Sequence, residues 1–123
     1  MLAPDPSQPV YKIVGLQEWE AARATGTYEG SAVDRSDGFI HFSTAMQVAG
    51  TAAKHFAGRN DLLLVAIDGA MLAKRFGDDY RYEPSRGGQL FPHLYGSLPL
   101  DAVVWVRDMP LGENGTHNVP RLG

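Results

Sequence analysis

The sequence contains no cysteine, which excludes disulfide bonds, thiolate nucleophiles and sulfur-ligated zinc sites. It also lacks a basic excess, because 14 acidic and 11 basic residues give a net charge of −3. Binding to a nucleic-acid backbone depends on clustered Lys and Arg, so we expect no nucleic-acid partner. No apolar run reaches the ~20 residues of a membrane span, and no basic and apolar signal segment opens the chain. We therefore expect a cytoplasmic protein without membrane contact.

The length of 123 residues fits one domain, since domains most often contain about 100–150 residues. Residues 1–9 carry three prolines and no periodic pattern, which predicts a flexible tail. Residues 110–123 are rich in Gly, Asn, Thr and Pro and predict a second flexible tail. A single globular domain is therefore expected over residues 10–109.

Apolar and β-branched runs predict strands over 10–14, 39–43, 62–67, 80–83 and 102–106. The run 62–67 is apolar throughout and predicts a central strand buried on both faces, and 102–106 a final buried strand. Helical spacing of apolar residues predicts helices over 16–23 and from Thr44 to Gly58, and a short helical turn over 70–76. Loops are expected over 26–37 and 85–89. This order of elements predicts an α+β domain with helices packed on a small sheet.

His41 is the first candidate for chemistry, because it interrupts an apolar strand just before a predicted helix start. Clefts with accessible amides form where strand ends meet helix N-termini. The alternative is a half-buried histidine hydrogen-bonded to the backbone. Ser43 lies two residues further on, so strand alternation places both side chains on one side. No G-x-S-x-G motif surrounds Ser43, which favours a binding role over a nucleophile.

Three further candidates lie in the second half of the chain. His93 stands among Pro, Gly and aromatic residues, as in a pocket wall, although a surface loop is the alternative. Glu83 could act as acid or base if desolvated, or form a surface pair with Arg81. Arg86 precedes two glycines, so its guanidinium and their open amides could bind an anion. No metal-ligand spacing links these residues with His41, and we predict no metal site.

Four stretches carry a family resemblance: Tyr11-Lys12, Gly38-Phe39-Ile40-His41-Phe42-Ser43-Thr44, Ser85-Arg86-Gly87-Gly88 and Phe91-Pro92-His93-Leu94-Tyr95-Gly96. The chain resembles the bacterial domain of unknown function family 952 from about Val10 to Asp108. This resemblance implies an ADP-ribosyltransferase-like fold, with a split, mainly antiparallel sheet and two to three helices. Active relatives with that fold bind NAD in a cleft.

The resemblance also implies roles for individual residues. His41 would take the position of an aromatic ring, and His93 would lie near the place of a catalytic glutamate. No acid stands beside His93, and Glu83 would fill that role from the neighbouring strand by stabilising positive charge on the ribose. The implied catalytic residues are His41, Glu83 and His93. Taken together with the residue patterns above, the predicted ligand-binding residues are Tyr11, Lys12, Ser43, Arg86 and Tyr95.

Three functions follow as hypotheses. The first is an enzyme with NAD as substrate and no required cofactor, which catalyses ADP-ribosyl transfer or glycosidic cleavage. The second is a non-catalytic module that binds a nucleotide or another small ligand in the same cleft. The third is an interaction domain without a site, in which both histidines are merely hydrogen-bonded polar residues. Nothing in the sequence indicates an oligomeric state.

Overall fold

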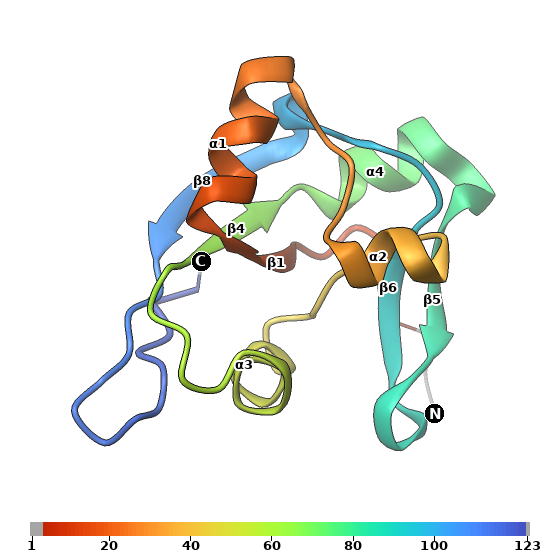
Figure 1. The fold of residues 1–123 in the computed structure, drawn as a ribbon. Coiled ribbons are helices and arrows are strands. Elements are labelled where there is room, and N and C mark those ends of the chain that lie inside the picture. The colour runs from red at the N-terminus through yellow and green to blue at the C-terminus, as the bar shows by residue number, and fades with distance from the viewer. Residues whose placement is uncertain (1–3, 123) are drawn as a thin grey trace.

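The computed structural model describes residues 4–122, apart from the side chain of Arg86 (Figure 1). In chain order its strands and α-helices are β1 (Val10–Gly15), α1 (Leu16–Thr25), β2 (Thr27–Tyr28), α2 (Ala32–Asp37), β3 (Ile40–His41), α3 (Val48–His55), β4 (Leu62–Ile67), α4 (Gly69–Phe76), β5 (Tyr80–Pro84), β6 (Leu90–Leu94), β7 (Leu98–Pro99) and β8 (Val103–Asp108). Short 3₁₀ turns at Gly77–Asp79, Arg86–Gly88 and Leu100–Ala102 connect some of them. None of the helices between residues 4 and 122 is long and apolar enough to cross a membrane.

The strands form two three-stranded sheets and one two-stranded pair. Their orders are β1-β4-β8, β3-β6-β5 and β2-β7, and every pairing is antiparallel. A bridge between Tyr11 and Ser43 joins the two larger sheets through two backbone hydrogen bonds of 2.8 Å. The expectation of a small α+β domain with antiparallel sheets is confirmed.

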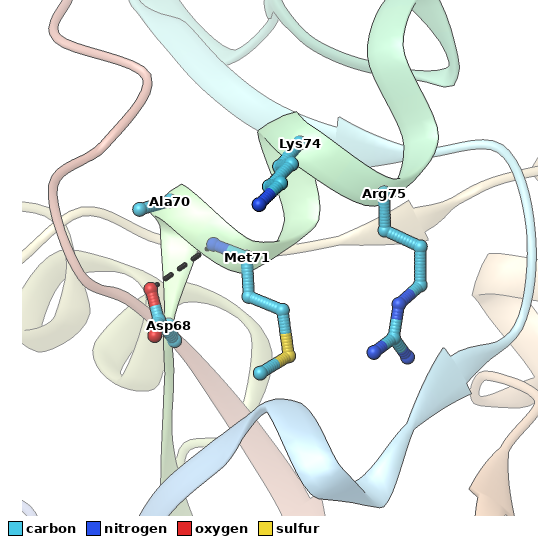
Figure 2. A pocket seen from close by; sticks show the side chains of 5 residues that line it. All are labelled: Asp68, Ala70, Met71, Lys74 and Arg75. Carbon is cyan, nitrogen blue, oxygen red and sulfur yellow. Dashed lines mark hydrogen bonds between the residues drawn. The ribbon is translucent and has the colours of Figure 1, made fainter.

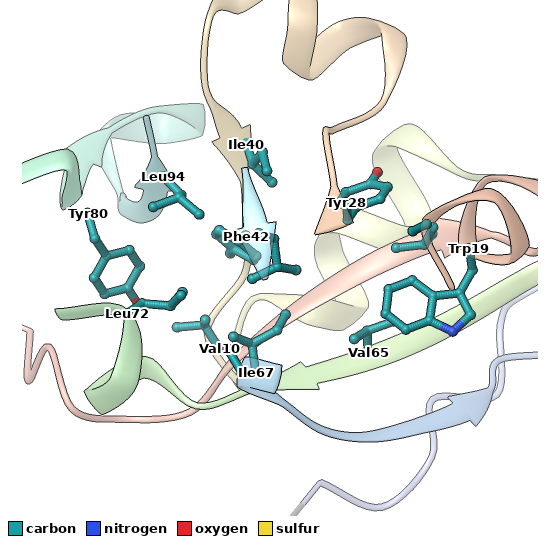
Figure 3. Close-up of a cluster of buried hydrophobic side chains, with 14 of the residues drawn as sticks. Val10, Trp19, Tyr28, Ile40, Phe42, Val65, Ile67, Leu72, Tyr80 and Leu94 are labelled. Carbon is teal, nitrogen blue, oxygen red and sulfur yellow. The ribbon is translucent and has the colours of Figure 1, made fainter. Parts of the chain in front are cut away.

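The central strand β4 is buried on both faces, as its unbroken apolar run predicts. Leu63, Val65 and Ile67 point into a first core with α1, α4 and the second sheet (Figure 3). Leu62, Leu64 and Ala66 point into a second core with α3 and the C-terminal segment. Full burial of a Val, Leu or Ile side chain contributes about 1.5–3 kcal/mol, so β4 stabilises both halves of the molecule.

Helix α1 follows the predicted pattern and extends two residues beyond it. Trp19 and Ala22, three positions apart, turn inward, and Trp19 packs against Tyr28 with ring centroids 6.5 Å apart. Gly26 ends the helix with φ +87°, a conformation that only glycine adopts readily.

The expected loop over 26–37 is wrong, because it contains β2 and the helix α2. The chain therefore has four α-helices among its described residues, one more than expected. Ser31 and Asp34 form a reciprocal capping box at the start of α2, and each side chain accepts a hydrogen bond from the backbone amide of the other. Polar composition hid this helix, since only Val33 among its six residues is a large apolar residue and it is exposed.

Two further elements differ from the expected ones. Helix α3 begins at Val48 instead of Thr44, because residues 45–47 form a turn in which the Gln47 side chain accepts from the Thr44 amide at 3.0 Å. Strand β8 was expected to be buried, yet it lies at the sheet edge and alternates between partly buried and exposed residues. Val104, for example, is 62% exposed.

The segments predicted as tails make contacts with the domain. The Gln8 side chain donates to the Tyr82 hydroxyl at 3.0 Å, and residues 1–3 lie outside the described part. At the other end, Leu111 and His117 form a bridge, and Val119 packs against the second core. Flexibility of the two segments stays a prediction.

Gly69→Ala is expected to displace the N-terminal segment from α4. A Cβ atom at Gly69 would lie 2.1 Å from the carbonyl oxygen of Gln8, so we expect a loss of about 1–3 kcal/mol in the free energy of unfolding. Gly50→Ala, at an exposed position inside α3, is the matched control and should gain about 0.5–1 kcal/mol. Urea denaturation of both variants measures this, and equal stability of Gly69→Ala and wild type would contradict the close approach.

Candidate functional site

A buried carboxylate, Asp34, organises one half of the candidate site. Its side chain is 2% exposed and comes from the first turn of α2. Oδ2 accepts from the backbone amide of Ser31 at 2.9 Å and from Lys12 Nζ at 2.8 Å. Oδ1 accepts from the backbone amide of His41 at 3.2 Å and lies 2.6 Å from His41 Nδ1. One carboxylate therefore holds together α2, β1 and β3.

The partners of Asp34 determine its charge state. Burial on its own raises the pKa of this carboxyl, but the hydrogen bond from His41, the Lys12 ammonium and the Ser31 amide outweigh burial. The pKa of Asp34 consequently lies well below its usual range. Asp34 is thus ionised at neutral pH, and it neutralises the buried ammonium of Lys12.

His41 lies between two carboxylates. Its Nδ1 faces Asp34, and its Nε2 is 3.0 Å from Oδ2 of Asp37, at the last residue of α2. A doubly protonated ring can donate to both carboxylates, whereas a neutral ring can donate to only one. The His41 side chain is about one-third exposed, so the ring is held in place and still reachable from solvent.

The other half of the site is a triad of Glu83, His93 and Tyr95. Glu83 Oε1 lies 2.8 Å from His93 Nδ1 and accepts from the Tyr95 hydroxyl at 2.7 Å. These residues meet because β5 and β6 are antiparallel neighbours, with Arg81 opposite His93 and Glu83 opposite Phe91. The Arg81 guanidinium lies over the Tyr95 ring, 4.4 Å from its centroid.

These contacts shift three pKa values. Hydrogen bonds from Tyr95 and His93 lower the pKa of Glu83, and the same carboxylate raises the pKa of Tyr95. Burial lowers the pKa of His93, against the opposing effect of the Glu83 hydrogen bond. An ionised carboxylate only accepts, so His93 carries its proton on Nδ1 and a lone pair on Nε2. That Nε2 is buried and has no hydrogen-bond partner among the described residues.

Phe39 connects the two halves. Its ring centroid lies 4.3 Å from His93, 4.6 Å from His41 and 5.0 Å from Tyr95. The two imidazoles are themselves 5.2 Å apart, edge to face, because His41 and His93 pair directly across β3 and β6. Phe39 is partly buried, and its ring packs against both imidazoles.

The structure brings together most of the predicted site residues. His41, Glu83, His93 and Tyr95 lie in this cluster, and Lys12 reaches it through Asp34. We call the set formed by Asp34, Asp37, Phe39, His41, Glu83, His93 and Tyr95 the two-histidine cluster.

Tyr11 and Ser43 lie elsewhere. Adjacent residues of a strand point to opposite faces. Because Lys12 faces Asp34, Tyr11 points to the other face of β1 and packs in the second core, against Trp105. The Ser43 hydroxyl is buried and pairs with Thr51 of α3 at 3.0 Å. Strand β3 ends at His41, so the expected alternation from His41 to Ser43 does not continue. The Arg86 side chain lies outside the described part of the chain.

Sequence analysis missed Asp34, Asp37 and Phe39. One signal was present for Asp34, since Ser31 and Asp34 have the spacing of a capping box. That signal normally precedes an apolar run, which α2 lacks. Nothing local indicates that Asp34 also reaches His41 and Lys12, because these contacts join three separate elements.

A hollow on the described surface lies apart from this chemistry. A depression of about 580 Å³ runs along α4, between Asp68, Met71 and Arg75 (Figure 2). Asp68 caps the helix by accepting from the Met71 amide, and Arg75 pairs with Asp101. Both side chains therefore have structural partners, and none of the predicted site residues lines this depression.

The free energy of unfolding is expected to fall as the pH drops below about 6.5. Burial lowers the pKa of His93 in the folded chain, so the unfolded chain binds this proton at a higher pH than the folded chain does. Protonation then stabilises the unfolded state relative to the folded state, and the free energy of unfolding falls. Urea titrations between about pH 7.5 and 5.5 should show a smaller pH dependence for His93→Gln than for wild type. His117→Gln, in the C-terminal segment, is the control and should keep the wild-type dependence. Equal pH dependence in all three proteins would contradict a neutral, buried His93.

Comparison with known proteins supports the fold and places the cluster within the matched region. Residues 13–106, which include Asp34, His41, Glu83 and His93, match the family described as "Protein of unknown function (DUF952)". A crystal structure of protein CC0527 from Caulobacter crescentus is 44% identical, with a TM-score of 0.82 over 90% of this chain and 94% of that chain. Its solution NMR structure is 44% identical, with a TM-score of 0.76 over 88% and 90%. A search of curated proteins gives no match.

Proposed function

The chain belongs to the DUF952 family of proteins of unknown function, and we propose that its two-histidine cluster binds NAD or a similar nucleotide at the ribose. The proposed reaction is ADP-ribosyl transfer or cleavage of the bond to nicotinamide. An ADP-ribosyltransferase-like fold is part of this proposal, supported by two antiparallel sheets that meet at the Tyr11–Ser43 bridge. The proposal rests on Glu83, an ionised and partly exposed carboxylate held against His93.

Glu83 is suited to stabilise a cationic sugar. When the bond between ribose C1′ and nicotinamide breaks, the electron pair leaves with nicotinamide and positive charge develops on the ribose. A fixed carboxylate facing that charge stabilises the transition state more than the ground state. Tyr95 and His93 both bind Oε1 of Glu83, which fixes the carboxylate in position.

His93 is suited to accept a proton in the second half of the reaction. Water or another nucleophile forms a bond to ribose C1′ and gives up one proton. Because Glu83 holds Nδ1–H and burial keeps the ring neutral, Nε2 offers a lone pair for that proton. The His93 ring is buried and packs against Phe39, so the proposal requires Phe39 to move aside when a nucleotide binds.

A non-catalytic nucleotide-binding module is the second candidate. One observation favours it, namely that His93 is 3% exposed, so its Nε2 lies away from solvent in the state described. In that function the exposed face of His41 and the Phe39 and Tyr95 rings would contact the ligand without a reaction.

The experiment that separates these functions is incubation of the protein with NAD. The enzyme hypothesis predicts nicotinamide release, measured by chromatography, together with a rise in melting temperature that grows with NAD concentration. A ligand at 100 times its Kd stabilises the folded state by about 2.7 kcal/mol, which is readily measured. His41→Ala should lose most of the thermal shift, and His117→Ala should keep it.

Each outcome assigns a function. Release of nicotinamide by wild type supports the enzyme. A thermal shift without release supports the binding module. If NAD and related nucleotides produce neither effect, nucleotide recognition at the two-histidine cluster is wrong.

A further inference from the structure

One row of side chains crosses the β3-β6-β5 sheet from β3 to β5. His41 on β3 pairs with His93 on β6, and His93 pairs in turn with Arg81 on β5. Directly opposed residues of antiparallel strands point to the same face of a sheet, so the Arg81 side chain shares a face with both imidazoles. The opposite face of the same strands is buried in the first core through Ile40, Leu94 and Tyr80.

The two ends of this row have different surroundings. At the β3 end, His41 lies between Asp34 and Asp37 of α2. At the other end, β5 is the outer strand of the sheet, and Arg81 is exposed (Figure 1). Among the described residues no carboxylate forms a salt bridge with its guanidinium, which lies over the Tyr95 ring, 4.4 Å from the centroid. A ligand that approaches the row from β5 therefore meets an exposed positive charge.

Tyr95 links this guanidinium to Glu83. It directly follows β6 and is the diagonal neighbour of Arg81, a spacing that long and aromatic side chains bridge. The Tyr95 hydroxyl donates to Glu83 Oε1, and its ring lies under the guanidinium. Within the described part of the chain, no hydrogen bond uses the guanidinium N–H groups of Arg81, so they are available to an oxyanion.

The charges on this face give Arg81 a particular importance for an anionic ligand. Asp37 and Glu83 are partly exposed carboxylates, which repel an anion. The Lys12 ammonium is buried and neutralised by Asp34. Arg81 is the only lysine or arginine in β3, β5 and β6. A phosphate group at these strands therefore has one cation to bind, and a guanidinium can bind two phosphate oxygens at once.

The spacing of Glu83 and Arg81 matches a phosphorylated ribose. The two residues are two positions apart on β5, about 7 Å along the strand, with both side chains on one face. In a ribose 5′-phosphate, C1′ and the phosphate lie at opposite ends of the sugar, a similar distance apart. We propose that Arg81 binds the 5′-phosphate of the ribose whose C1′ faces Glu83, a role that rests on the nucleotide-binding function proposed above. The ligand is then a nucleotide or dinucleotide, and a nucleoside is a poor substitute.

Nicotinamide mononucleotide and nicotinamide riboside differ only in the 5′-phosphate, and calorimetric titration of the full chain with each tests this role. Wild type should bind the mononucleotide at least about tenfold more tightly, the usual effect of a hydrogen bond between charged groups. Arg81→Gln should lose this preference, while its affinity for the riboside stays at the wild-type value. Its melting temperature should stay close to that of wild type, because the Arg81 side chain is exposed.

Two variants control for the loss of charge alone. Arg107→Gln removes another guanidinium that lies over a ring, that of Trp105 at 4.0 Å, on the β1-β4-β8 sheet. This variant should keep the preference for the mononucleotide. Arg81→Lys keeps the charge at the cluster but loses the paired N–H groups of the guanidinium, so it should retain part of the preference.

The results distinguish a failure of this role from a failure of the proposed function. If wild type binds both compounds with equal affinity, or Arg81→Gln keeps the full preference, the role of Arg81 is wrong and nucleotide binding at the two-histidine cluster stands. Equal losses of preference in Arg107→Gln and Arg81→Gln would also overturn the role, because net charge then explains both. If wild type binds neither compound and no NAD, the proposed function is wrong, and the role of Arg81 is wrong with it.

Discussion

Asp34→Asn is expected to lower the free energy of unfolding by about 3–5 kcal/mol. The substitution preserves shape but removes the charge that neutralises the buried ammonium of Lys12, and a buried charge without its partner is destabilising by that amount. Asparagine also places an amide group where Asp34 accepts four hydrogen bonds, from Ser31, Lys12 and twice from His41. Urea denaturation at neutral pH measures the loss.

Two variants test the cause of that loss. Asp37→Asn removes the other carboxylate at His41, but Asp37 is about half exposed, so we expect at most about 1 kcal/mol. Lys12→Met combined with Asp34→Asn should be more stable than Asp34→Asn alone, because it removes the unpaired ammonium. A loss below about 1 kcal/mol for Asp34→Asn would contradict the view that Asp34 holds the cluster together.

Glu83→Gln is expected to lower kcat/KM for nicotinamide release about 10²–10³-fold, the usual effect of removing one group that stabilises transition-state charge. Glutamine can still accept from Tyr95 and His93, so the triad keeps its arrangement and loses only the charge. The melting temperature should therefore change little. Chromatographic rates with NAD, over a range of concentrations, separate kcat from KM.

The matched control for this variant is Glu113→Gln, the same substitution at an exposed position of the C-terminal segment. It should leave both kcat and KM at wild-type values. If Glu83→Gln releases nicotinamide as fast as wild type, Glu83 does not stabilise the ribose, and the reaction proceeds through other residues.

Sequence patterns predicted those parts of the fold that depend on one element at a time. The run from Leu62 to Ile67 has no polar residue, and only a strand covered on both faces can bury it. The burial of β8, from Val103 to Asp108, was harder to predict. Its apolar content suggested burial, but among the described residues the strand has a neighbour on one side only. A strand's position in the sheet depends on the other strands, and its own residues do not report it.

The candidate site was predictable to the extent that each residue stood out locally. His41 was found because it interrupts an apolar strand, Glu83 because it ends a predicted strand, and His93 because it stands among Pro, Gly and aromatic residues. Antiparallel pairing of β3, β6 and β5 then brings the three residues together. Asp34 was missed because its partners lie 22 residues before and seven residues after it in the chain. Ser43 was misplaced because alternation holds only within a continuous strand.

Imidazole ¹⁵N signals during an NAD titration test most directly whether the two-histidine cluster binds a nucleotide. The account predicts that the signals of His41 and His93 Nε2 move with increasing NAD, while the signals of His117, bound to the carbonyl of Arg59, stay in place. Before NAD is added, His93 should show a proton on Nδ1 and a free Nε2. If the signals of His41 and His93 do not move even at the highest soluble concentration of NAD, the account is contradicted.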